Sequence, residues 1–241
     1  MNFSIIIPVL HEAENINPLI EHIHSIGKGI DYEIIVVDGS PTHNTISAVK
    51  DDNIISIASE AGRARQMNRG AEAAHGDVLI FLHADTRFPE KAFEKISEAL
   101  QDNIYVGGAF SLGMDTERKS LKFIAWTANV RVWFTRVPFG DHAIFLKRTF
   151  FQEIGGYNDI PLMEDVELME RIRKAGEKII ILKDKVKTSP RKWEKGGVFR
   201  TTLRNHIIRK LYYLGVSPNT LHRMYYDKNP STARKKNNTP S

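Results

Sequence analysis

Residues 77–86 read Asp-Val-Leu-Ile-Phe-Leu-His-Ala-Asp-Thr, an apolar run that ends abruptly in the polar side chains of His83, Asp85 and Thr86. An apolar run of this length, rich in branched and aromatic residues, is typical of a fully buried strand. Open α/β sheets bind ligands at the carboxyl ends of their strands, which is where these polar side chains lie. A carboxylate there can hold Mg²⁺ or Mn²⁺ against a phosphate, because both ions prefer oxygen ligands. The alternative is an ordinary surface turn that caps the next helix.

The residues before this run favour a parallel sheet. Apolar runs at 3–9 and 32–38 have the composition of strands covered on both faces, and the second ends in Asp38. Apolar residues at helical spacing separate them, namely Ile16, Leu19, Ile20 and Ile23. A shorter run follows at 53–58. Strands and helices that alternate in this way predict right-handed βαβ units and an α/β fold.

Composition bounds the class of protein. The 241 residues are 41% hydrophobic and 26% charged, which suits one sizeable globular α/β domain. The absence of cysteine excludes disulfides, thiolate nucleophiles and cysteine metal sites, and it is compatible with a reducing cytoplasm. The first residues lack a basic segment and contain only a short apolar run, so they predict a strand and no signal peptide. No apolar stretch approaches the roughly 20 residues of a membrane span.

The net charge of +5 hides an asymmetry along the chain. Residues 187–241 contain 13 Lys and Arg against 2 Asp and Glu, a net charge of +11, and the remainder has −6. A basic segment on a mildly acidic body indicates an anionic partner, such as phosphate groups, a membrane surface or nucleic acid. A solvated basic tail is the alternative, and it is the preferred interpretation for residues 234–236.

Arginines open the helix that is predicted after Gly62. Arg63 and Arg65 fall in its first turn, where the helix dipole disfavours cations. We therefore expect them to face an anion, together with the amide groups of the helix N-terminus. Ordinary surface arginines are the alternative.

The second half of the sequence predicts a strand at 104–112, whose Gly107 and Gly108 suggest close approach of backbone or ligand. The segment 121–137 is aromatic and basic, and two interpretations fit it. It is either a helix that lies at the acceptor side or at a membrane surface, or a helix that faces the core while its cations snorkel to solvent. The acids Glu164 and Asp165 begin a further helix.

The C-terminal third is predicted to continue with strands at 178–182 and 186–189 and a basic loop at 191–197 that carries Trp193. A basic amphipathic helix follows, because Leu203, Ile207, Ile208 and Leu211 recur at helical spacing. Residues 227–241 are polar and irregular, and we expect a disordered tail.

Five short motifs occur in order at the ends of these predicted elements. They are Ile-Ile-Pro-Val-Leu-His-Glu (6–12), Val-Val-Asp-Gly-Ser (36–40), Gly-Arg-Ala-Arg-Gln-Met-Asn (62–68), Leu-His-Ala-Asp-Thr (82–86) and Met-Glu-Asp-Val-Glu (163–167). Together they resemble a family 2 glycosyltransferase of the GT-A fold, over residues 3–218. The block 62–66, the pair Gly107-Gly108 and the stretch Ser-Pro-Arg-Lys-Trp (189–193) resemble a compact bacterial subgroup.

The resemblance implies one GT-A domain over residues 1–226, with a mainly parallel central sheet, helices on both faces and a helical, basic C-terminal extension. Residues 1–102 would form the half that binds a nucleotide-sugar donor. Residues 103–226 would form the acceptor half, which includes the basic C-terminal helix.

The resemblance also implies roles for residues of the donor half. Pro8, Val9 and Glu12 would flank the base and ribose, and Asp38 would contact uracil or ribose. Gly62, Arg63, Arg65 and Gln66 would lie near the nucleotide, which we expect to be UDP. His83, Ala84 and Asp85 occupy the place of the family's Asp-x-Asp motif. Asp85 would hold Mg²⁺ or Mn²⁺, and His83 would be either a second ligand or a ribose contact.

For the acceptor half, the resemblance implies that Glu164 and Asp165 supply the catalytic base, with Asp165 preferred. The residues expected on the acceptor side are Gly107, Gly108, Gly140, Asp141, Arg191 and Trp193. The last two match the family's Gln-x-x-Arg-Trp motif only loosely, and the missing glutamine counts against processive polymer synthesis. The acceptor would be a lipid phosphate, a saccharide or a small metabolite.

These residue types fit one in-line displacement with inversion. A metal and arginines can neutralise the charge that develops on the departing diphosphate, while a carboxylate removes the acceptor's proton. A nucleotidyltransferase is an alternative, although residues 9–14 lack the glycine-rich loop such an enzyme would need after its first strand. A non-catalytic nucleotide-binding or membrane-adaptor protein is another. We expect no specific nucleic-acid partner. We expect the protein in the cytoplasm or at the inner face of the membrane, where an anionic lipid surface would be a further partner.

Overall fold

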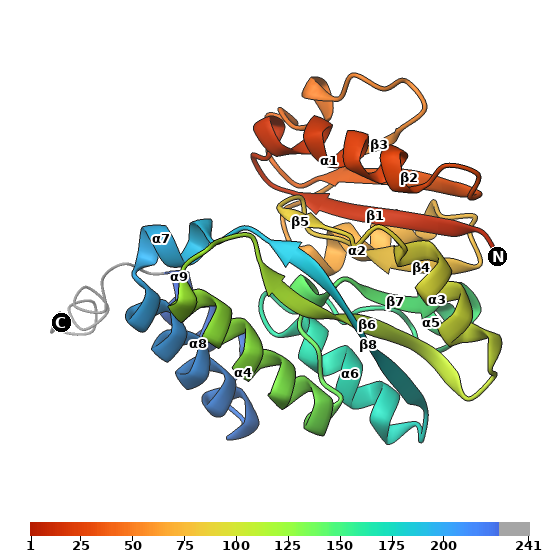
Figure 1. The fold of residues 1–241 in the computed structure, drawn as a ribbon. Coiled ribbons are helices and arrows are strands. Elements are labelled where there is room, and N and C mark those ends of the chain that lie inside the picture. The colour runs from red at the N-terminus through yellow and green to blue at the C-terminus, as the bar shows by residue number, and fades with distance from the viewer. Residues whose placement is uncertain (227–241) are drawn as a thin grey trace, which may run out of the picture.

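The computed structural model describes residues 1–226, which form an α/β domain built on one sheet (Figure 1). The strands are β1 (Phe3–Val9), β2 (Tyr32–Asp38), β3 (Ile55–Ala58), β4 (Val78–Phe81), β5 (Thr86–Arg87), β6 (Tyr105–Met114), β7 (Ile144–Lys147) and β8 (Lys178–Thr188). The helices are α1 (Ala13–Ile26), α2 (Arg63–Glu72), α3 (Ala92–Gln101), α4 (Lys119–Thr135), α5 (Arg148–Glu153), α6 (Glu164–Lys174), α7 (Arg191–Gly196), α8 (Val198–Tyr213) and α9 (Pro218–Tyr226), with 3₁₀ turns η1 (Ile46–Ala48) and η2 (Gly140–His142). The predicted tail at 227–241 lies outside the described residues.

The sheet runs in the order β3-β2-β1-β4-β7-β6-β8-β5. The first four strands are parallel to one another, as the alternation of strands and helices predicted. β7 is antiparallel to both of its neighbours, β4 and β6, and so joins this parallel half to the parallel pair β6 and β8. The prediction of a mainly parallel sheet with helices is confirmed.

The core lies on both faces of the sheet, which explains why β1 is apolar at every position except Ser4. Ile5 and Ile7 face one buried cluster, which also contains residues of α1 and α3. Ile6 faces the other, together with residues of α2, α5 and α6. Each fully buried isoleucine contributes roughly 1.5–3 kcal/mol to folding. Helices therefore cover both faces, as predicted.

The C-terminal third differs from the prediction in four places. The expected loop at 191–197 contains the short helix α7, and the two expected strands form the single strand β8, whose register against β6 shifts near Ser111. A second helix, α9, follows α8. Of the four apolar positions that predicted an inward-facing stripe on α8, Ile208 is buried, whereas Leu203 and Ile207 are exposed.

Within residues 1–226, no helix combines the length and the apolar character that crossing a membrane would require.

Candidate active site

The charged side chains of the predicted motifs come together near the carboxyl ends of β1 and β4, and the name cleft is used for this region, defined by Arg63, His83, Asp85, Asp141 and Asp165. Arg63 enters it from the first turn of α2, and His83 and Asp85 enter it from the loop after β4. Asp141 comes from η2 and Asp165 from the first turn of α6. Arg63 and Asp141 each perturb the pKa of His83, Asp85 and Asp165, which shows that the fold brings the five groups together.

The acidic pair is positioned by the start of α6. Met163 has a left-handed backbone with φ of 70°, which costs on the order of 1 kcal/mol in a non-glycine residue and turns the chain into the helix. Oδ2 of Asp165 accepts the backbone N–H of Gly140 at 2.7 Å. Burial raises the pKa of Asp165, against the effect of this hydrogen bond, and burial and Asp165 together raise the pKa of Glu164. The pair is therefore a proton acceptor of unusual strength for carboxylates.

Arg63 balances part of this negative charge. Burial is the largest single effect and opposes its charged form, but Glu164, Tyr226, Asp165 and Tyr225 together outweigh it and raise the pKa of Arg63. The Arg63 side chain nevertheless remains accessible to solvent in the cleft. A cation beside two carboxylates and open to solvent is available to an anionic ligand.

His83 lies against η2. A Cβ atom added to Gly140 would come within 2.8 Å of Nε2 of His83, so only glycine fits there without displacing the imidazole. Burial, followed by the charge of Arg63, lowers the pKa of His83 to about 3. The imidazole is therefore neutral at physiological pH and can offer a nitrogen lone pair.

Asp85 and Asp141 are the side chains best placed to hold a divalent cation. Burial and then Glu12 raise the pKa of Asp85, and Asp141 raises it further, against the effect of Arg191. Oδ1 of Asp141 is buried without a hydrogen-bond partner. Among residues 1–226 no three His, Asp or Glu side chains form a ready metal site, so a cation here would need ligands from a bound molecule.

Two residues that the sequence placed near the nucleotide are engaged within the protein. Both oxygens of Asp38 accept backbone N–H groups, from Ser40 at 2.8 Å and Thr45 at 2.9 Å. Burial works to raise the pKa of Asp38, but these bonds outweigh it and lower the pKa. Nε2 of Gln66 donates to the carbonyls of Val9 and Val37, each at 2.8 Å. Both side chains shape the ends of β1 and β2.

The other residues expected in the donor half lie either at the strand ends or at the surface. Pro8 and Ala84 border the strand ends, Pro8 half-buried and Ala84 buried. Gly62 precedes α2 with φ of 145°, a conformation that favours glycine. Arg65 is directed away to the surface, where it pairs with Glu60 at 2.6 Å and Asp159 at 2.9 Å.

The predicted acceptor residues separate into two groups. Gly140 and Asp141 lie in the cleft, as described. Gly107 and Gly108 lie inside the sheet, where an added Cβ would collide with the carbonyls of Phe145 and Ile180.

The motif around α7 lies on the donor side of the cleft. Nη2 of Arg191 donates to Oε1 of Glu12 at 2.6 Å, so Arg191 faces the loop after β1. Trp193 is buried in the same cluster as Ala84 and Leu121, beneath the Asp85 loop.

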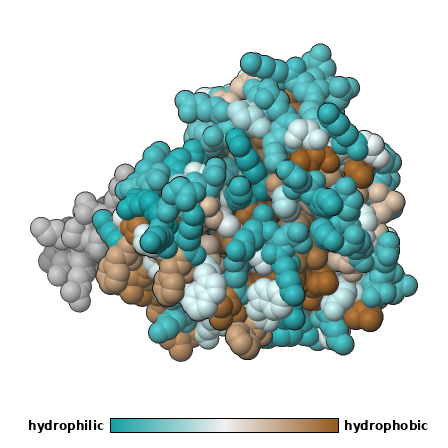
Figure 2. All heavy atoms as spheres, viewed as in Figure 1, coloured by the Kyte–Doolittle hydropathy of each residue, from teal (hydrophilic) through white to brown (hydrophobic). Residues whose placement is uncertain are grey.

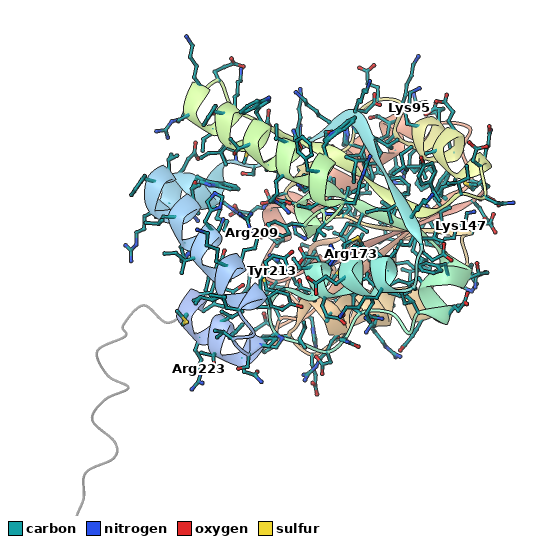
Figure 3. The ribbon with its side chains drawn as sticks, turned by 90° about the horizontal axis from the view of Figure 1, so that it is seen from below. Lys95, Lys147, Arg173, Arg209, Tyr213 and Arg223 are labelled. Atoms are coloured by element: carbon teal, nitrogen blue, oxygen red, sulfur yellow. The ribbon has the colours of Figure 1, made fainter. Side chains whose placement is uncertain are left out.

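Sequence reasoning missed two arginines, Arg131 and Arg209, of which Arg131 is close enough to Asp165 for that carboxylate to act on its pKa. The guanidinium of Arg131, on α4, stacks on the ring of Phe139 at 4.0 Å and donates to the carbonyl of Val137 at 2.8 Å. Burial, followed by the charge of Arg209, lowers the pKa of Arg131 to about 10. Arg209 and Tyr213 lie on α8, on the side that faces the body of the molecule (Figure 3). No sequence spacing marks this pair, because only the packing of α8 beside α4 brings it together.

The comparison with known families fits this geometry. Residues 4–155 match the sequence model of the family described as Glycosyl transferase family 2. The chain belongs to this family. The resemblance inferred from the five motifs is therefore confirmed, and it covers more than half of the chain.

Relatives in the family differ in length and substrate. A dolichol-phosphate mannosyltransferase of Pyrococcus furiosus is 30% identical over 125 residues, which are 48% of this chain and 36% of that protein. The succinoglycan biosynthesis protein ExoA of Rhizobium meliloti is 25% identical over 251 residues, covering 89% of this chain and 75% of ExoA. This family 2 chain thus spans about a third of the length of the mannosyltransferase.

A solved structure shares the fold over nearly the whole chain. The mannosyltransferase PcManGT of Pyrobaculum calidifontis, in complex with GDP-Man and Mn²⁺, superposes with a TM-score of 0.61 and 17% identity. The match covers 93% of this chain and 70% of PcManGT. The GT-A fold predicted from sequence is confirmed for this member of family 2.

Proposed function

We propose that the protein is a glycosyltransferase that moves a sugar from a nucleoside-diphosphate sugar to a hydroxyl or phosphate acceptor. The observation that carries this proposal is the position of Asp165. Its carboxylate is held by the N–H of Gly140 in a cleft that also contains Arg63, His83 and Asp85. A base, a cation and a metal-binding carboxylate are the groups that displacement of a nucleoside diphosphate requires.

The diphosphate of the donor would lie between Arg63 and Asp85. The unpartnered oxygen of Asp141 and the carboxylate of Asp85 suit Mg²⁺ or Mn²⁺, with phosphate oxygens completing the coordination. When bound, the cation would neutralise charge on the departing diphosphate. The Mn²⁺ in the complex of PcManGT, a protein of the same fold, supports this assignment.

Asp165 would remove the proton of the acceptor as that oxygen attacks the anomeric carbon, giving inversion in one step. Its raised pKa makes it a stronger base than an ordinary carboxylate. The same base suits a sugar hydroxyl and a monoanionic phosphate monoester, whose second pKa is about 6.

We favour a lipid phosphate as the acceptor. Both Asp165 and Arg209 act on the pKa of Arg131, and an anion bound beside the two arginines would offset the repulsion of Arg209 on Arg131. Nη2 of Arg131 is buried without a hydrogen-bond partner. The mannosyltransferase relative, named for dolichol phosphate, supports the same class of acceptor.

The test is a transfer assay with UDP- and GDP-sugars, Mn²⁺ and a short-chain polyprenyl phosphate. We expect turnover with one nucleotide, and losses of roughly 10²–10⁴-fold in kcat for Asp165→Asn. Asp85→Asn should lose activity mainly by weakening the response to Mn²⁺. Asp159→Asn removes an exposed carboxylate outside the cleft and serves as the matched control.

Three outcomes would contradict the proposal. Full transfer by both Asp165→Asn and Asp85→Asn would remove the assigned roles. A product that retains the anomeric configuration would exclude the single displacement, and release of pyrophosphate from nucleoside triphosphates would indicate a nucleotidyltransferase instead.

A further inference from the structure

Helix α4 is apolar on two opposite faces. Its inner face, represented by Leu121, Ala125 and Val132, is buried against the core. The large side chains of its outer face are Phe123, Trp126, Val130, Trp133 and Phe134. At 100° per residue these five positions fall within about a third of the helix circumference, opposite the buried face. The outer stripe is therefore a second apolar face and not a continuation of the first.

The outer face is open to solvent. Phe134 is 86% exposed, Phe123 61% and Trp126 59%. Helix α8 packs beside α4 and adds an exposed stripe of its own, Phe199, Leu203 and Ile207. Hydrophobic side chains gather over this end of the molecule, where Figure 1 places the two helices (Figure 2). A helix with two opposite apolar faces is normally covered on both, and within residues 1–226 nothing covers the outer one.

Cations border the apolar face. A groove of about 650 Å³ separates α4 from the edge of β6 and β8, and Trp126, Trp133 and Phe134 form one of its walls. Lys183, Lys185 and Lys187 form the other, because alternate residues of a strand share one side. Lys122 completes the rim, and no Asp or Glu of the described chain lines the groove.

We propose that the outer face of α4 docks on an anionic lipid bilayer. The aromatic side chains would lie at the boundary of headgroups and acyl chains, where tryptophan is favoured, and the lysines would contact lipid phosphates. The charge pattern argues against a second copy of this chain, because two-fold pairing of the face would bring its lysines together. The same pattern argues against residues 228–241 as the partner of this face, because they contain four cations and no large apolar side chain.

Vesicle flotation tests this docking without measuring sugar transfer, so it can fail independently of the proposed function. Wild-type protein should float with phosphatidylcholine vesicles that contain about 30% phosphatidylglycerol, and much less with phosphatidylcholine alone. Lys183→Gln/Lys185→Gln should lower the partition coefficient roughly 25-fold, since each cation near an anionic surface accounts for about fivefold. Lys28→Gln/Lys50→Gln changes exposed lysines that follow α1 and η1. This double variant should leave the partition coefficient unchanged, because Figure 1 places α1 at the other end of the molecule from α4.

The apolar contribution is tested by Phe134→Ser, since a side chain that is 86% exposed contributes little to folding. We expect weaker flotation for Phe134→Ser. Ile104, which precedes β6 and is 57% exposed, provides the control, and Ile104→Ser should float as well as the wild-type protein. Fluorescence of Trp126 and Trp133 should shift to the blue on binding.

Three results would overturn the docking proposal. The first is absence of wild-type flotation with anionic vesicles. The second is an equal loss in the two lysine double variants. The third is a concentration-dependent dimer that Phe134→Ser abolishes while vesicles remain unbound.

Discussion

Arg191 and Glu12 are joined by a hydrogen bond of 2.6 Å between Nη2 and Oε1, although 179 residues separate them along the chain. The pair connects the loop after β1 to α7. Both of its members are close enough to Asp85 to act on that carboxylate. Its two members act on that carboxylate in opposite directions, since Glu12 raises the pKa of Asp85 and Arg191 lowers it.

A double-mutant cycle on Glu12→Gln and Arg191→Gln should give a coupling energy of about 0.5–1 kcal/mol, because the pair is only partly shielded from solvent. Urea unfolding of the four proteins measures it. Arg191→Gln alone should also raise the pKa of Asp85, because it removes a nearby cation. A coupling energy of zero would mean that the ion pair is not formed in solution.

Gln66→Leu should destabilise the fold by about 2–3 kcal/mol. The substitution leaves the carbonyls of Val9 and Val37 buried without their donor, and unsatisfied buried groups are costly. Chemical unfolding checks this, with the exposed Gln152→Leu as control, which should change stability by less than about 0.5 kcal/mol. Equal effects of the two substitutions would contradict the assigned role.

Gly140→Ala should destabilise the protein by about 1–3 kcal/mol, because its methyl group overlaps Nε2 of His83. Removing the imidazole creates room, so His83→Ala/Gly140→Ala should be more stable than the sum of the single changes predicts. Thermal unfolding of the three variants measures the difference. Strict additivity would show that the two residues do not touch.

The acidic pair should make stability depend on pH. Burial and Asp165 raise the pKa of Glu164 to about 7 from an ordinary value of 4.5, so the folded state binds this proton more tightly than the unfolded state. The free energy of unfolding should therefore fall as pH rises from about 4.5 to 7, by up to about 3 kcal/mol. Glu164→Gln should lose this dependence and be the more stable protein at about pH 8. Parallel pH–stability curves for the two proteins would refute the shift.

Activity should depend on pH in the opposite direction, through the ionisation of Asp165. The base works only when ionised, so kcat should fall as pH drops through its raised pKa. The acid limb of the rate profile should thus lie above the ordinary range for a carboxylic acid. A limb at the value of a free carboxyl group would indicate that Asp165 is not the base.

The sequence predicted the parallel half of the sheet because its strands carry their own signal. β1 and β2 are covered on both faces, so most of their residues are apolar, and their ends are marked by Pro8 and Asp38. The insertion of β7 between β4 and β6 has no such signal, since a four-residue strand does not reveal its neighbours. The two residues of β5 are likewise too few for a period to show.

The acidic residues of the cleft were predictable because each follows a recognisable element. Asp85 follows a buried strand and Asp165 begins a helix. Arg131 was not predictable as part of the site, because it lies in an apolar helix and only tertiary contacts with Phe139 and Arg209 identify it. The outward orientation of Leu203 and Ile207 was missed for a related reason, since spacing shows that two residues share a face but not what covers it.

The pairing of β5 with β8 has a consequence for biosynthesis. Thr86 and Arg87, next to Asp85, find their partners only at Thr188 and Lys187, at the far edge of the sheet. At about 5–20 residues per second, a ribosome needs roughly 5–20 s to reach those partners. The nascent chain must therefore wait with its acidic loop unfinished, so the speed of translation and the help of chaperones should govern how much active protein a cell obtains.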